Sequence, residues 1–160
     1  MRSLRYWPLV ALILVTMLAA SALTHGLNKS SHQWMHFFMG FFFCQFALLK
    51  LFHPANFAEG FQMYDLIAKK VALYAYIYPF IELGLGLSYL AFFYPAWTYS
   101  LTILVMAVGA VGVIKALRKG LDVRCACMGT VLDVPLSTVP LTEDIGMGLM
   151  ALALLISIFS

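Results

Sequence analysis

The sequence predicts an all-α protein, a polytopic transmembrane helical bundle with a four-helix core and an additional N-terminal transmembrane helix. The first observation is composition, since 63% of the 160 residues are hydrophobic and only 11% are charged, against about 25% charged residues in a typical soluble domain. The second is that the hydrophobic residues gather in five runs, each near the roughly 20 residues that a spanning helix needs. Because lipid satisfies no backbone hydrogen bonds, open sheets are excluded.

The first run covers about residues 7–24 and follows Arg2 and Arg5. A basic start and small residues at the end also fit a cleaved secretory signal. We favour a retained transmembrane helix, because the run is long for a signal core and further apolar runs follow it. The second run, about 34–52, is rich in Phe and Met, and His53-Pro54 closes it because proline cannot continue a helix.

Residues 55–68 are too polar to span a membrane. Phe57, Phe61 and Tyr64 recur there at helical spacing among charged residues, which predicts a short amphipathic helix in the membrane interface. A loop with aromatic anchors is the alternative that the sequence leaves open.

Three more runs follow, at about 71–93, 99–117 and 141–159, so that residues 1–160 form one integral membrane domain. Tyr94, Trp97 and Tyr99 lie at the predicted turn between two of these runs and indicate an interfacial aromatic belt. The last run opens with Glu143 and Asp144, which suit the positive end of a helix dipole.

The cations predict the orientation. Only Lys29 falls on one side of the predicted membrane, and the other side receives Arg2, Arg5, Lys50, Lys69, Lys70, Lys115, Arg118, Lys119 and Arg124. Because the positive side is normally cytoplasmic, we expect a multi-pass protein of the cell inner membrane with its N-terminus inside and its C-terminus outside. The formal charge of +3 is too small and too scattered for nucleic-acid binding.

The sharpest chemical signal is Cys125-Ala126-Cys127-Met128 in the predicted cytoplasmic loop, 118–140. Two close thiols can form a strained disulfide, exchange with a partner thiol or bind a soft metal. Arg124 favours the reactive thiolate. Since the chain has three cysteines, a disulfide framework is excluded. Glu82 is the second candidate, because an ionisable group inside a membrane is costly and tends to be functional or paired.

A second group of soft ligands lies at the opposite side of the membrane. His32 and His36 are four residues apart, as are Met35 and Met39, so each pair can share a helix face. Imidazole and thioether ligands suit Cu(I). The alternative metal site therefore comprises these four residues outside and Cys125, Cys127 and Met128 inside.

Four segments together resemble the MauE/DoxX family of redox-associated membrane proteins. They are Leu48–Pro54, Tyr78–Leu83, Cys125–Thr130 and Glu143-Asp144, and the resemblance runs from Met35 to the C-terminus. It implies a bundle akin to quinone-linked thiol oxidoreductases, assistance in the maturation of methylamine dehydrogenase, and a thioredoxin-like partner. Some relatives are associated with heavy-metal-binding proteins. The sequence has no Cys-X-X-Cys, which argues against a quinone cofactor.

Three hypotheses follow. The first is a thiol-redox membrane protein in which Cys125, Cys127 and Arg124 exchange electrons with a thioredoxin-like partner and Glu82 holds or shuttles a proton. The second is a soft-metal binder or transporter for a Cu(I)-like ion, working with a metal-binding protein. The third is a non-catalytic scaffold. The sequence names no certain cofactor and no oligomeric state.

Overall fold

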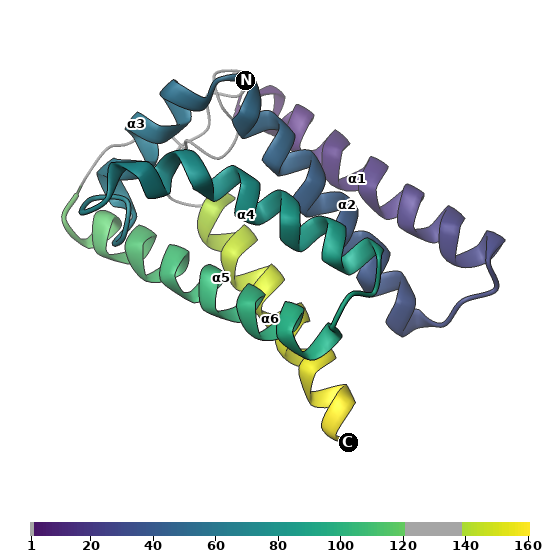
Figure 1. Cartoon of the computed structure of the whole chain (residues 1–160). Coiled ribbons are helices and arrows are strands. Elements are labelled where there is room, and N and C mark those ends of the chain that lie inside the picture. Colours follow the sequence, from purple (N-terminus) through teal and green to yellow (C-terminus); the bar gives the residue numbers. More distant parts are fainter. Residues whose placement is uncertain (1, 121–138) are drawn as a thin grey trace.

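The computed structural model describes residues 2–120 and 139–160, and these form six helices and no strand. The helices, labelled in Figure 1, are α1 (Arg2–Gly26), α2 (Ser31–Phe52), α3 (Pro54–Tyr64), α4 (Ala72–Leu90), α5 (Pro95–Arg118) and α6 (Val139–Phe159). The all-α prediction is therefore confirmed.

Local sequence explains several helix boundaries. The Gln33 side chain accepts a hydrogen bond from the Ser30 backbone amide at 3.1 Å, which satisfies a free donor where α2 begins. Proline occupies the start of both α3, at Pro54, and α5, at Pro95. At that position the missing N–H costs nothing, because no helical partner would receive it.

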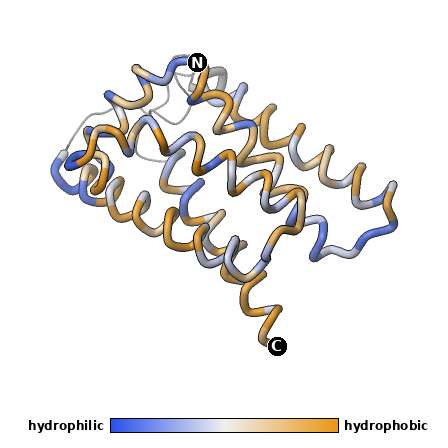
Figure 2. Tube along the Cα trace, in the orientation of Figure 1, coloured by the Kyte–Doolittle hydropathy of each residue, from blue (hydrophilic) through white to orange (hydrophobic). Residues whose placement is uncertain are grey.

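Four of the described helices are long and apolar enough to cross a membrane, and the chain is a multi-pass membrane protein. The four stretches are Tyr6–Gly26, Ser31–Phe52, Pro95–Arg118 and Pro140–Phe159. Along the described chain, Figure 2 shows hydrophobic residues over the helices and hydrophilic residues mainly at their ends and turns. The predicted run 71–93 forms α4, which is not among the four because its tyrosines, Pro79 and Glu82 make it more polar.

The helices form a bundle in which α4 lies alongside α2 and α5, while α1 lies on the outer side of α2 (Figure 1). The most extensive packing joins α5 to α6 and α2 to α4. One hydrophobic core gathers residues of α1, α2, α4, α5 and α6, and a second lies under α3. α1 therefore lies on the outside of the bundle, as expected for an additional N-terminal helix.

A pair of glycines lets α2 and α4 approach closely. A Cβ atom built on Gly86 would lie 2.8 Å from the Cys44 Sγ and 3.0 Å from the Gly40 carbonyl oxygen. On Gly40, a Cβ would meet the Gly86 carbonyl oxygen at 3.0 Å. Small residues at such a crossing are typical of membrane helices, because packing between backbones drives their association. Gly84 is different, since nothing lies within 4 Å of its built Cβ.

The aromatic face of α3 packs against protein. Phe57, Phe61 and Tyr64 are all buried, in a core shared with α4 and α5. The helical spacing of these residues thus reflects a face that covers one end of the bundle, where α2 ends and α4 begins.

Candidate functional site

The described bundle contains a buried ion pair beneath α3. The Lys50 ammonium on α2 lies 2.5 Å from the Glu82 Oε2 on α4, and the two side chains are only 3% and 1% exposed. Transferring two charges out of water costs several kcal/mol per ion, so both need partners inside the protein. The pair explains how an acidic residue is tolerated in the interior of the bundle.

Aromatic rings surround the ammonium. The Lys50 Nζ lies 5.2 Å from the ring centre of Tyr78, 5.7 Å from that of Phe57 and 6.0 Å from that of Phe46. The negative faces of such rings attract a cation, and the attraction strengthens where water is excluded. Lys50 is therefore held by α3 and α4 as well as by its carboxylate partner.

Two further carboxyl groups face the same place from α6. Glu143 and Asp144 line a cavity of about 20 Å³ together with Lys50 and Tyr64, a volume suited to about one water molecule. Gly109 of α5 makes room for one of them, since a Cβ built there would lie 2.8 Å from the Asp144 Oδ2. Among the described residues, the Glu82 Oε1 is buried and has no hydrogen-bond partner. We call Lys50, Glu82, Glu143 and Asp144 the charged cluster.

Asp65, in the turn after α3, borders this region. Its Oδ1 accepts hydrogen bonds from the backbone amides of Ile67, at 2.9 Å, and Ala68, at 2.8 Å. Burial raises the pKa of Asp65 above its ordinary value, although these two hydrogen bonds act in the opposite direction. Burial likewise raises the pKa of the neighbouring Tyr64, so its hydroxyl stays protonated.

A second polar network occupies the opposite half of the bundle. The His36 Nδ1 lies 3.2 Å from the Tyr89 carbonyl oxygen, and its Nε2 contacts the Tyr99 hydroxyl. Tyr89 in turn donates to the Thr102 hydroxyl at 3.0 Å. The predicted aromatic belt is thus corrected for Tyr99, which is fully buried, while Tyr94 and Trp97 are exposed.

Two of the proposed outer metal ligands, His32 and His36, lie close together, with ring centres 5.4 Å apart. His32 lies near Ser157, whereas both ring nitrogens of His36 face tyrosines. Met39 is fully buried in the core and Met35 packs at its edge. Residues 2–120 and 139–160 hold no group of three or more His, Cys, Asp or Glu side chains placed to bind a metal. The predicted loop residues Arg124, Cys125, Cys127 and Met128 lie outside the described residues.

Two sequence interpretations need correction. The cation pattern predicts Lys50 at the membrane boundary, but Lys50 is buried and paired with Glu82. The sequence contains a sign of this pair, because an acidic residue in a spanning run needs a cation and Lys50 lies within an apolar stretch. The sequence places Glu143 and Asp144 at the start of the last helix, but α6 begins at Val139, so they lie in its second turn. There they face the cluster.

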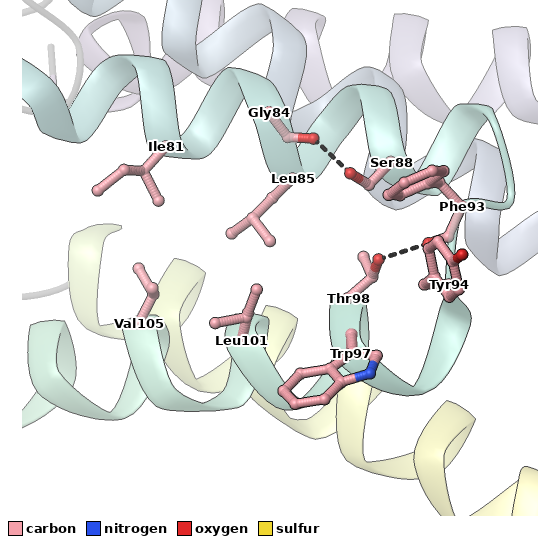
Figure 3. A pocket seen from close by; sticks show the side chains of 10 residues that line it. All are labelled: Ile81, Gly84, Leu85, Ser88, Phe93, Tyr94, Trp97, Thr98, Leu101 and Val105. Atoms are coloured by element: carbon pink, nitrogen blue, oxygen red, sulfur yellow. Dashed lines mark hydrogen bonds between the residues drawn. The ribbon is translucent and has the colours of Figure 1, made fainter.

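A groove with a volume of about 540 Å³ lies between α4 and α5. Figure 3 shows Ile81, Leu85 and Leu101 on its walls. Two of its hydroxyls are occupied, since Ser88 donates to the Gly84 carbonyl and Thr98 to the Phe93 carbonyl, both at 2.8 Å (Figure 3). The exposed rings of Tyr94 and Trp97 add one polar group each, and the rest of the lining is mainly apolar, which suits lipid.

The fold and the site define a class, that of all-α multi-pass membrane proteins, here with a charged cluster buried at one end of the bundle. Residues 5–158 match the family model described as "Methylamine utilisation protein MauE". The chain therefore belongs to the MauE family. Searches of curated proteins and of solved structures found no match.

Proposed function

We propose that the protein is a thiol-redox membrane protein that exchanges electrons with a thioredoxin-like partner and so assists the maturation of another protein. The observation that carries this proposal is Cys125-Ala126-Cys127 beside Arg124 in a chain of the MauE family. Two thiols one residue apart, next to a cation that favours thiolate, suit disulfide exchange better than structural packing. The description of the family, carried over to this chain, supports a role in methylamine utilisation.

In the proposed reaction Cys125 and Cys127 lose two electrons and two protons as they form a disulfide. The disulfide of the partner gains both and becomes a dithiol. The reverse transfer regenerates the pair. Glu82, buried and bound to Lys50, serves as a proton-holding group of the bundle.

The proposed orientation puts the N-terminus and the Cys-X-Cys loop in the cytoplasm and the C-terminus outside, in the inner membrane. Although Lys50 no longer counts as a loop cation, the remaining cations keep the same bias. Stable disulfides are rare in the cytoplasm, so a transient one fits this position.

The test is thiol labelling in intact membranes under oxidising and reducing conditions. Cys44 is the built-in control, because it is a free, partly buried thiol within the spanning helix α2. We expect labelling of Cys125 and Cys127 by a membrane-impermeant maleimide applied from the cytoplasmic side to fall on oxidation, with Cys44 unlabelled throughout. Unchanged labelling of both loop cysteines would refute the redox role. Copper in the purified protein that disappears in Cys125→Ser would instead favour the soft-metal alternative.

A further inference from the structure

Carboxyl groups outnumber the cation in the charged cluster. Glu82, Glu143 and Asp144 come from two helices and meet one ammonium, that of Lys50. With every carboxyl ionised, the cluster would hold a net negative charge at a site where Lys50 and Glu82 are buried and Glu143 and Asp144 are partly buried. Like charges at one buried site raise the energy of the ionised state, and a bound cation or proton relieves it.

A second observation points to an unfilled position there. The Glu82 Oε1 is buried, its side chain is 1% exposed, and it lacks a hydrogen-bond partner among the described residues. A buried carboxylate oxygen without a donor costs roughly 1–3 kcal/mol or more. The cavity of about 20 Å³ beside Lys50 has room for about one water. Lys50, Glu143 and Asp144 line this cavity, and Lys50 joins it to Glu82 through the ion pair.

We propose that the charged cluster is a proton-binding site, in which Glu143 and Asp144 share a proton that a water in the small cavity links to the Lys50–Glu82 pair. A proton fits better than a metal ion, because no described group of three or more ligating side chains is placed to hold one and a cavity for about one water leaves no room for a hydrated ion. The proposal rests on described residues alone and stands independently of the thiol chemistry.

Several described elements contribute groups around the proton. α5 contributes the space at Gly109, and the titratable groups that face the cluster are Lys50 of α2, Tyr64 of α3, Asp65 of the following turn, Tyr78 and Glu82 of α4, and Glu143 and Asp144 of α6. Glu143 also lines an apolar cavity of about 340 Å³ between α1, α2 and α6. It therefore borders both the small cavity beside Lys50 and this apolar cavity.

Infrared spectroscopy of the full chain in lipid nanodiscs tests this site directly, because a protonated carboxyl has a C=O stretch that a carboxylate lacks. We expect wild-type protein at neutral pH to show this band and to lose it reversibly on alkaline titration. Asp144→Asn and Glu143→Gln should each weaken the band, and the double variant should abolish it. Asp65→Asn, measured in parallel, should leave the band intact.

The controls separate this proposal from the proposed function. Glu59→Gln changes an exposed carboxyl on α3 and should leave the band intact. The Cys125→Ser, Cys127→Ser variant should also keep it, so the proton site can stand if the thiol role fails. Absence of the band from the wild-type protein at neutral pH would overturn the proposal, whatever the variants do. So would a band that survives in the folded Glu143→Gln, Asp144→Asn variant, or a band that sodium ions remove.

Discussion

The Lys50–Glu82 pair gives the sharpest stability prediction. Lys50→Met keeps a long unbranched side chain but removes the only described hydrogen-bond partner of Glu82. Because both side chains are almost completely buried, we expect a loss of about 3–5 kcal/mol in unfolding free energy, the range found when one member of a buried pair is removed. Glu82→Gln should cost less, since the ammonium keeps three aromatic rings and the carboxyls of α6.

Reversible unfolding by SDS in mixed micelles, followed by tryptophan fluorescence, measures these differences. Lys69→Met is the matched control, because Lys69 is exposed, and it should change stability by no more than about 0.5 kcal/mol. The double variant Lys50→Met, Glu82→Gln should be more stable than Lys50→Met alone. If Lys50→Met lowers the unfolding free energy no more than Lys69→Met does, the ion pair does not stabilise the protein as described. The same conclusion follows if the double variant is no more stable than Lys50→Met.

Three further predictions follow from single contacts. Gly86→Ala should destabilise the protein by about 1–3 kcal/mol, since its Cβ would lie 3.0 Å from backbone atoms of α2. Gly84→Ala, with nothing within 4 Å of its Cβ, should be neutral or slightly stabilising. Equal effects of the two variants in the SDS assay would contradict the close crossing of α2 and α4. Tyr99→Phe should cost about 1–3 kcal/mol by leaving the His36 Nε2 without its partner, while Tyr94→Phe, at an exposed ring, should change little. Asp65→Asn tests a pH dependence. Burial raises the pKa of Asp65 above its ordinary value of 3.8, so the protonated carboxyl stabilises the folded state. This stabilisation is complete below pH 3.8 and is lost as the pH rises through the raised pKa. The variant should therefore gain on wild type from strongly acidic toward neutral pH, and a constant difference would refute this.

The sequence predicts the fold class well, because the lipid environment imposes a simple rule on composition and helix length. Pro54 also marks the end of α2 correctly. Hydropathy alone does not say which face of a helix meets which neighbour. For that reason hydropathy places Lys50 at the membrane boundary and Tyr99 in the aromatic belt. Both are in fact buried, and each bonds to a residue far away in the sequence.

The candidate site was predictable in part. Glu82 stood out, because an isolated acidic residue in an apolar run needs an explanation. Its meeting with Glu143 and Asp144 depends on the register of α6, which begins at Val139, and on the space left at Gly109. Neither can be derived from spacing within one helix. The contacts of His36 with Tyr89 and Tyr99 are likewise tertiary, and its spacing from His32 does not predict them.

The ion pair also has a consequence for biogenesis. Glu82 lies 32 residues after Lys50 in the chain, so α2 leaves the ribosome with its ammonium unpaired and acquires a partner only once α4 has been made. Until then the long side chain of Lys50, two residues from the end of α2, can reach toward water. We therefore expect α4 to dock on α2 late in assembly. Nascent chains stalled before Glu82 should leave an engineered Lys50→Cys thiol open to labelling, and equal protection before and after synthesis of α4 would exclude this order.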